Sequence, residues 1–176
     1  MVNAIRVATE ARPTTDAVWA ALAAIPDPEI PVISLVELGV VRDVAWRDDQ
    51  LVVTLTPTYS GCPATEVIES SIVAALEAEG LGPVRVEMRR APAWTTDWMS
   101  EKGRRRLREY GIAPPGPVVA AATAPLRFVP RPPRPLACPR CESYDTERIS
   151  AFGATACKAL WRCRACREPF EHFKPI

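Results

Sequence analysis

The sequence predicts a small α/β domain followed by a separate cysteine-rich β domain. Strand, helix and strand patterns succeed one another between residues 40 and 88. A proline-rich stretch occupies residues 112–137, and two Cys-x-x-Cys pairs lie beyond it. We therefore expect an α/β domain over residues 1–111, a linker over 112–137 and a metal-binding unit over 138–176.

The composition is ordinary for a soluble globular protein. The 176 residues are 48% hydrophobic and carry a formal net charge of +1, which gives no bulk electrostatic case for a nucleic acid or an anionic membrane. There is no signal-peptide apolar core and no apolar run of transmembrane length, so a cytoplasmic protein without a membrane partner is expected. Six cysteines in such a protein suggest metal or thiol chemistry rather than disulfides.

A first helix is predicted after a polar arm over residues 1–13. Thr14, Thr15 and Asp16 are good N-cap residues, and Pro26 ends the pattern. The apolar positions have helical spacing: Val18, Trp19, Leu22 and Ile25.

The next segment, residues 27–34, carries two carboxylates between prolines. This arrangement predicts a rigid, extended loop. The loop either serves only to end the helix, or presents Asp27 and Glu29 beside the turn that contains Cys62.

A β-hairpin and a strand–helix–strand unit follow. Strands are predicted over residues 40–46 and 51–56, a helix from Pro63 to about Glu79, and a half-exposed strand over 84–88. A strand–helix–strand crossover makes its two strands parallel, whereas a hairpin makes its strands antiparallel. The prediction is therefore a three-stranded mixed sheet with helices on one face.

Cys62 lies in the turn between the second strand and the helix. Gly61 permits a tight bend and Pro63 suits a first helical position, so Cys62 is predicted to be the N-cap. Free N–H groups and the helix dipole would then favour a thiolate, as nucleophile or soft metal ligand. A buried, inert cysteine is the alternative.

A basic helix is predicted from Trp98 to Tyr110, after a start signal at residues 95–97. Its Lys and Arg side chains form a solvated face, or Arg104, Arg105 and Arg106 dock an acidic partner. The linker that follows contains eight prolines and no periodicity, which is typical of a semi-rigid, extended segment.

The two Cys-x-x-Cys pairs are separated by 21 residues. Each pair can place two sulfurs on one tetrahedral ion, so together they predict a Cys₄ site. Zn²⁺ is the expected ion, with a single iron or an iron–sulfur cluster as the alternative. The predicted ligands are Cys138, Cys141, Cys163 and Cys166.

Short strands over residues 144–150, 159–162 and 169–173 would complete a zinc ribbon. For Cys157, core packing or a solvated thiol is the preferred interpretation, and His172 is the one histidine of the chain. Both residues are retained as substitute metal ligands.

Several motifs together resemble a known family. The α/β part is similar to the small domain of SufT-like and cytosolic iron–sulfur targeting proteins, and residues 14–176 as a whole resemble the PaaD family of phenylacetate degradation. The motifs are DPEIP at 27–31, ELGV at 37–40, TPTYSGCP at 56–63, RAPAWTTDW at 90–98 and FGATACK at 152–158.

The resemblance implies a role in iron–sulfur protein maturation. Cys62 would be the reactive or ligand residue, with Asp27, Glu29 and Thr58 nearby. The family is grouped with the oxygen-dependent phenylacetyl-CoA epoxidase, whose oxygenase subunit contains di-iron and whose reductase contains flavin and a [2Fe–2S] centre. Glu142 departs from the glycine often found in the first knuckle, which places that turn's geometry in question.

We therefore expect a non-catalytic accessory protein that assists assembly or insertion of an iron or iron–sulfur centre. Its expected partners are the oxygenase and reductase subunits. One soft ligand, Cys62, is too few for a stable cluster, so transient transfer is expected rather than storage, and a homodimer is one way to supply two sulfurs. The alternatives are a Cys62-dependent thiol enzyme and a zinc-ribbon module that binds a protein or a nucleic acid.

Overall fold

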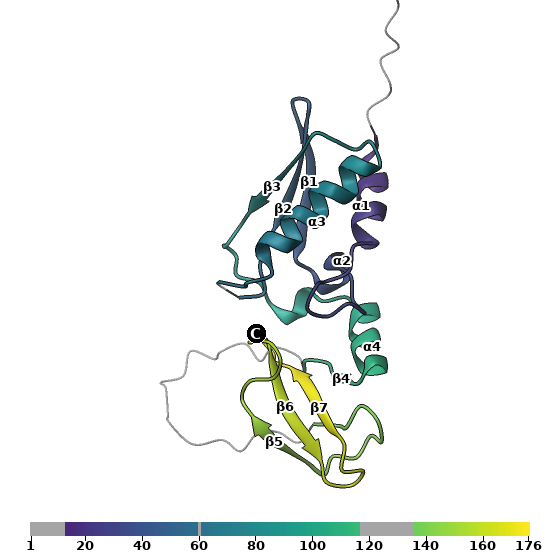
Figure 1. The fold of residues 1–176 in the computed structure, drawn as a ribbon, viewed down its shortest axis with the longest axis vertical. Coiled ribbons are helices and arrows are strands. Elements are labelled where there is room, and N and C mark those ends of the chain that lie inside the picture. The colour runs from purple at the N-terminus through teal and green to yellow at the C-terminus, as the bar shows by residue number, and fades with distance from the viewer. Residues whose placement is uncertain (1–12, 60, 117–135) are drawn as a thin grey trace, which may run out of the picture.

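The computed structural model describes residues 13–59, 61–116 and 136–176. It is elongated, with an α/β domain at one end and a β ribbon at the other (Figure 1). Apart from Pro13, the arm expected over residues 1–13 lies outside the described residues, as does most of the linker. No helix within the described parts of the chain is long and apolar enough to cross a bilayer.

The α/β domain begins with two helices and a hairpin and continues with a crossover helix and a third strand. In chain order these elements are α1 (Thr15–Ala23), α2 (Leu35–Leu38), β1 (Val41–Arg47), β2 (Gln50–Leu55), α3 (Thr65–Ala78) and β3 (Val84–Met88). β1 pairs antiparallel with β2, and β2 pairs parallel with β3. The predicted three-stranded mixed sheet is confirmed, and α1 and α3 cover one of its faces (Figure 1).

Local capping explains where the first two helices begin. The Thr14 side chain accepts a hydrogen bond from the N–H of Ala17, as predicted for α1. Ser34 and Glu37 form a capping box at α2, in which each side chain accepts from the other's backbone N–H. Gly39 ends α2 with φ 79°, and a Cβ there would lie 2.5 Å from the carbonyl oxygen of Trp98. Only glycine meets both requirements.

The loop over residues 27–34 is compact rather than extended. Asp27 Oδ1 accepts hydrogen bonds from the N–H groups of Glu29 and Ile30 at 2.9 and 2.8 Å. The N–H of Asp27 donates to the Ile33 carbonyl at 2.9 Å and closes the loop. The extended geometry predicted from the prolines is wrong, because the Asp27 side chain organises a local turn.

The basic helix is interrupted near its start. A short 3₁₀ helix, η1 (Thr96–Trp98), precedes α4 (Glu101–Tyr110), and Met99 between them is extended. The predicted single helix from Trp98 is therefore wrong in its first turn. Ser100 is a strong N-cap, and its hydroxyl accepts from the N–H of Gly103 at 3.0 Å, so the helix starts afresh there.

Two of the four arginines of α4 make contacts within the protein, and Arg105 is exposed. Arg104 donates to the carbonyls of Thr96 and Pro115 at 2.6 and 2.8 Å. Arg106 pairs with Glu37 at 2.9 Å. These contacts favour a structural role for the two arginines over the docking of an acidic partner.

Among the described residues, the ribbon sheet consists of β4 (Ile112–Ala113), β5 (Thr146–Ser150), β6 (Lys158–Cys163) and β7 (Pro169–Phe173). The last three confirm the predicted ribbon, and the sheet order is β4-β7-β6-β5. β4 pairs parallel with β7 in the segment assigned to the linker, so the expected linker start at residue 112 is corrected. A two-residue strand is too short to give a periodic pattern, and its buried apolar side chains fix its place.

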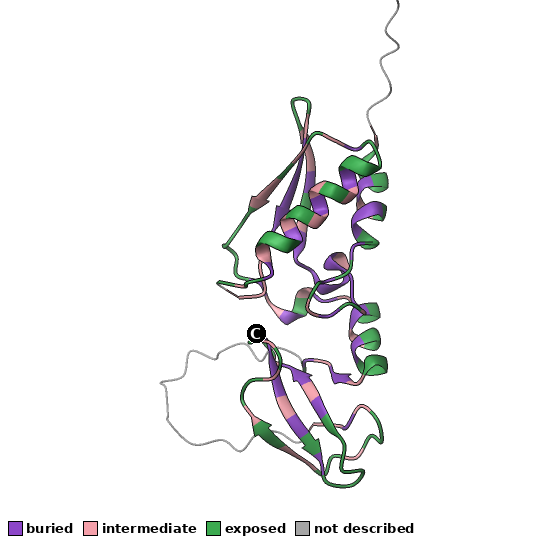
Figure 2. Ribbon diagram, viewed as in Figure 1, coloured by how far each residue is buried: buried purple, intermediate pink, exposed green. Residues whose placement is uncertain are grey.

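The ribbon shares a hydrophobic core with the α/β domain. Phe173 is fully buried and Cys157 is 4% exposed, and both belong to the α/β domain's core cluster. At the C-terminus, the Ile176 carbonyl accepts from the N–H of Thr96 and the hydroxyl of Thr95 at 3.1 and 2.8 Å. Buried residues accordingly continue from one domain to the next (Figure 2).

Candidate functional site

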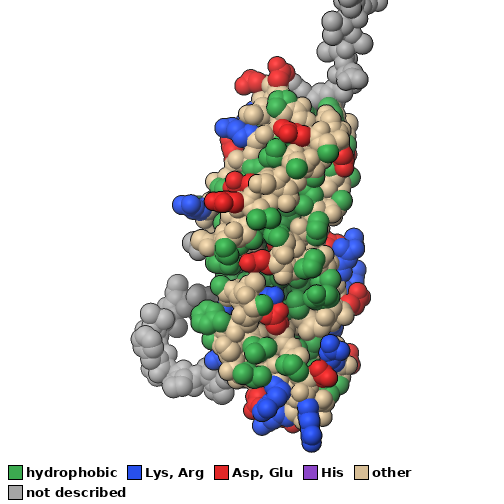
Figure 3. Space-filling view, viewed as in Figure 1, with side chains coloured by type: hydrophobic (Ala, Val, Ile, Leu, Met, Phe, Trp, Pro, Cys, Tyr) green, Lys and Arg blue, Asp and Glu red, His purple; other side chains and the backbone are tan. Residues whose placement is uncertain are grey.

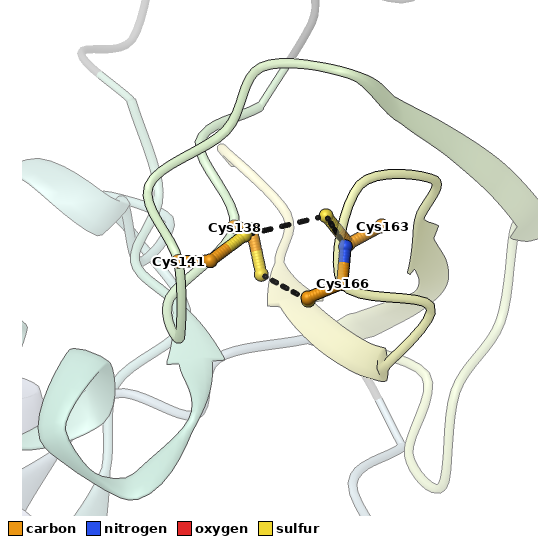
Figure 4. Close-up of side chains that lie close together, drawn as sticks. All are labelled: Cys138, Cys141, Cys163 and Cys166. Atoms are coloured by element: carbon orange, nitrogen blue, oxygen red, sulfur yellow. Dashed lines mark hydrogen bonds between the residues drawn. The ribbon is translucent and has the colours of Figure 1, made fainter.

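Four cysteine side chains converge from two turns of the ribbon (Figure 4). One turn precedes β5, and the other joins β6 to β7. All four sulfurs lie within 4.8 Å of one another. The Sγ atoms of Cys138 and Cys166 are 3.8 Å apart, and those of Cys141 and Cys163 are 3.5 Å apart.

These distances fit one tetrahedral ion. Zn–S bonds of about 2.3 Å place the sulfurs of a tetrahedron about 3.8 Å apart. The N–H of Cys166 points at the Cys163 sulfur at 3.5 Å and lowers the pKa of that thiol to about 7. Backbone N–H groups act in the same direction on Cys141 and Cys166, but hydrogen bonds with neighbouring sulfurs and burial outweigh them and raise the pKa of these two thiols. The four cysteines would hold the ion, which would supply folding free energy to a domain with a small core of its own.

Both knuckles contain a residue with left-handed backbone conformation directly after their second cysteine. Glu142 has φ 61° and Arg167 has φ 66°. The N–H of Glu142 donates to the Cys138 carbonyl at 2.9 Å. The first knuckle therefore forms its turn although Glu142 replaces the expected glycine. Glu142 adopts a left-handed backbone conformation that glycine would adopt more readily.

His172 lies outside this sulfur cluster. It is buried in β7, where burial lowers the pKa of its imidazole to about 4 and keeps it neutral. Among the described residues, only the four cysteines form a group of three or more potential ligand atoms close enough to hold one ion. The idea of His172 or Cys157 as a substitute ligand in the ribbon is therefore wrong.

Cys62 lies in a turn before α3 and is not its N-cap. The N-cap is Ala64, which makes no side-chain hydrogen bond. The Cys62 carbonyl accepts from both the N–H and the hydroxyl of Thr65, at 3.2 and 2.8 Å. This turn delays the start of the helix by two residues relative to the prediction. The Cys62 sulfur is therefore not placed at the free N–H groups of the first helical turn by capping.

The structure places Cys62 on a small cavity between the two domains. The cavity has a volume of about 30 Å³. The predicted neighbours Asp27, Glu29 and Thr58 line it together with Cys62. The acidic loop and the cysteine turn, which are separated by the hairpin in the sequence, therefore meet at one point.

The ribbon contributes the opposite part of the lining through Cys157 and Phe173. Of the two interpretations given to Cys157, packing agrees with its burial and a solvated thiol does not. The sequence did not predict that Cys157 lines the same cavity as Cys62, because no spacing or periodicity relates the two residues. Thr56, at the end of β2, was also missed as a lining residue.

Cys62 also lines a larger surface groove of about 910 Å³. Thr56, Thr58 and Cys62 line both the inner cavity and the groove. The thiol is therefore on the boundary between an internal space and a surface that a macromolecule could approach.

Burial dominates the electrostatics of the acidic loop. Desolvation raises the pKa of Asp27, although two backbone N–H groups oppose the shift. Burial and then the nearby Asp27 charge raise the pKa of Glu29. Lys158 counteracts both shifts and is itself buried, paired with Glu171 at 2.7 Å.

Two further groups favour their neutral forms: Tyr59, which lines the groove, and Cys157, which lines the cavity. Burial, followed by a hydrogen bond and negative charge from Cys62, raises the pKa of Tyr59. Burial raises the pKa of the Cys157 thiol, and Glu29 adds to the effect, while the Thr155 hydroxyl lies 3.0 Å from its sulfur and opposes it. Cys157 is thus a neutral thiol in the absence of a ligand.

Comparisons with known proteins identify both domains. A family model described as "Iron-sulfur cluster assembly protein" matches residues 15–88, and one described as "PaaD zinc beta ribbon domain" matches residues 122–174. The structure is also similar to a Bacillus anthracis protein solved as "Domain of Unknown Function DUF59". The identity there is 29%, with 52% of this chain and 89% of that chain covered and a TM-score of 0.49.

Two curated proteins are similar in sequence. The "Fe-S protein maturation auxiliary factor" of Porphyromonas gingivalis (strain ATCC BAA-308 / W83) is 35% identical over 78 residues, 43% of this chain and 73% of that protein. The other is a subunit of the "Putative 1,2-phenylacetyl-CoA epoxidase" of Escherichia coli (strain K12), and it is 50% identical over 171 residues, 97% of this chain and 99% of that protein. The chain therefore belongs to the PaaD family, with an iron–sulfur-assembly-type domain followed by a PaaD-type zinc β ribbon.

Proposed function

We propose that this protein is a non-catalytic accessory subunit of a phenylacetyl-CoA epoxidase system. It assists the assembly or insertion of an iron or iron–sulfur centre in the oxygenase or the reductase subunit. The near full-length similarity to the Escherichia coli epoxidase subunit and the assembly-type domain support this proposal. The Cys₄ site holds zinc and has a structural role.

The position of Cys62 is the observation that carries the proposal. Its side chain is partly buried and lines both the inner cavity and the surface groove. A thiol at such a boundary can bind a soft metal from one side and offer it to a docked client from the other. Storage would instead call for a closed set of ligands.

A Cys62→Ser variant tests the proposal in cells that grow on phenylacetate. Serine removes the soft ligand but preserves side-chain size, so soluble protein should be normal. We expect loss of phenylacetate-dependent oxygenase activity and of iron in one epoxidase subunit. Ser70→Ala is the matched control, because Ser70 is exposed on α3 and its hydroxyl donates to the Glu66 carbonyl of the same helix. Full activity of Cys62→Ser at normal abundance would refute the proposal.

A Cys62-dependent thiol enzyme is the second candidate. The structure favours it in one respect: Cys157 lines the same cavity and is a second thiol that could resolve an intermediate on Cys62. In that case Cys62→Ser would leave the iron content of the epoxidase subunits unchanged. The nucleic-acid alternative gains no support from the face in Figure 3, where acidic and basic side chains are interspersed.

A further inference from the structure

We propose that Cys157 of the ribbon and Cys62 of the α/β domain form a two-thiolate site for one soft divalent metal ion in the cavity between the domains. This inference rests on the proposed function and names its ligand as iron(II). It also assigns the ribbon a second role, as the carrier of one ligand. A single chain would then supply two sulfurs without a homodimer.

Cys62 and Cys157 line the same small space between the domains. Both are free cysteines, both contact the α/β domain's core cluster, and both line the cavity. A water molecule needs about 10–15 Å³ of such space, so a cavity of about 30 Å³ has room for one ion with a bound water. A cysteine that served only to fill the core would leave no such space beside it.

An unpartnered hydroxyl in the same cavity independently points to a ligand. Thr56 is 1% exposed, and its Oγ1 has no hydrogen-bond partner in the parts of the chain that the structure describes. Buried hydroxyl groups nearly always have a partner, and the missing one has to be sought in the cavity that Thr56 lines. The hydroxyl could donate to a thiolate or accept from a metal-bound water.

The fold holds Cys157 in place from several sides. Its carbonyl accepts from the N–H of Lys174 at 2.9 Å, and its sulfur lies 3.0 Å from the Thr155 hydroxyl. Its neighbour Lys158 is paired in register with Phe173, whose ring packs against Trp94 of the α/β domain. The ligand from the ribbon is therefore positioned before any metal arrives, which reduces the ordering needed on binding.

The donor set suits delivery rather than permanent binding. Two thiolates favour a soft or borderline ion. The Cys₄ cluster is the only group of three or more closely spaced ligands within the described residues, so a metal at Cys62 and Cys157 keeps open positions. Those positions are available to water or to a client residue reached through the groove that Cys62 lines.

Anaerobic titration of the zinc-loaded full chain with Fe²⁺ tests the site. Iron(II) binds such ligands more weakly than zinc, so the ribbon should keep its zinc while the second site fills. We expect one Fe²⁺ per chain, with thiolate-to-iron charge-transfer absorption in the near ultraviolet. Zinc content is measured alongside by elemental analysis.

Three variants separate ligation from packing. Cys62→Ser, Cys157→Ser and Cys157→Val should each weaken Fe²⁺ binding at least about ten-fold, the change that even an outer-shell substitution causes in metal sites. Cys157→Val retains apolar bulk, and thermal unfolding checks that it folds. Wild-type Fe²⁺ binding and absorption by folded Cys157→Val would overturn the inference. Ser71→Ala, a change on α3 that removes one hydroxyl–carbonyl bond, is the control.

The outcomes distinguish this inference from the proposed function. If both thiols bind Fe²⁺ but Cys62→Ser still supports an active epoxidase, the proposed function fails and the metal site stands. If Cys62→Ser abolishes epoxidase activity while Cys157→Val binds Fe²⁺ like the wild type, the site at Cys157 is wrong and the proposed function stands.

Discussion

The ring of Phe173 packs against Trp94, with the centroids 5.9 Å apart and the planes inclined at 49°. Phe173 belongs to the last strand of the ribbon, yet it is fully buried in the core of the α/β domain. The two domains therefore stabilise one another, and both contribute to the cavity that Cys62 and Cys157 line.

Phe173→Ala should destabilise the whole chain. Removing a fully buried aromatic side chain costs about 3–5 kcal/mol, through lost burial and the space left behind. The free energy of unfolding is measured by denaturant titration of the metal-loaded protein. Phe173→Leu is the matched control and should cost less than the alanine variant, because it leaves a smaller space. Equal stability of the wild type and the alanine variant would show that the shared core is not formed in solution.

Removal of the ribbon metal should unfold the ribbon and weaken the α/β domain as well. Zinc contributes about 10–16 kcal/mol to folding in small zinc-binding peptides, and Cys141→Ser removes one of its ligands. We expect loss of ribbon structure by circular dichroism, cleavage after residue 136 by limited proteolysis, and a lower melting temperature for the remaining domain. Cys62→Ser, outside the knuckles, should keep the ribbon. A ribbon unchanged after chelation and mutation would contradict the prediction.

Glu37 should make stability depend on pH in a defined direction. Burial raises its pKa, but the Ser34 N–H, Lys102 and Arg106 outweigh burial and hold the pKa below the ordinary value of 4.5. A carboxyl with a lowered pKa in the folded state contributes stability that is fully present above pH 4.5 and is lost as the pH falls through its folded pKa.

Glu37→Gln should therefore cost about 1–2 kcal/mol at pH 7, because it removes the charge but keeps an acceptor for the capping box. The difference from the wild type should shrink below pH 4.5. The check is the melting temperature of both proteins across this range. Glu101→Gln is the control, since the Glu101 side chain is 84% exposed. A difference that stays constant with pH would show that the charge of Glu37 is not responsible.

Glu142→Gly should stabilise the metal-loaded protein by about 0.5–1 kcal/mol. A non-glycine residue in the left-handed region costs about 1–2 kcal/mol, and part of the gain is offset by the larger freedom of glycine in the unfolded chain. Arg140→Gly, which lies in the same knuckle without a positive φ, should instead destabilise the protein. Denaturant titration of both variants decides the sign, and a loss of stability in Glu142→Gly would contradict the prediction.

Local pattern was enough to predict most of the elements. Thr14 caps α1, the hairpin and the parallel third strand lie where alternation placed them, and the paired cysteines bring four sulfurs together. Each of these features depends on residues close in sequence, through side-chain period, capping or knuckle geometry. Where two local signals competed, prediction failed: Pro63 suggested a helix start, but the Thr65 side chain bonds back to Cys62 and helix α3 begins later.

The sequence by itself determined the two domain types, the Cys₄ cluster and the candidate role of Cys62. Only the tertiary structure decided that Cys157 lines the same cavity as Cys62 and lies outside the Cys₄ cluster, and that Phe173 completes the core of the other domain. The alternation of apolar residues along a strand indicates which face is buried, but it does not indicate which other element packs against that face. That partner is selected by shape complementarity between surfaces distant in the chain, and the cavity between the domains exists only once they pack.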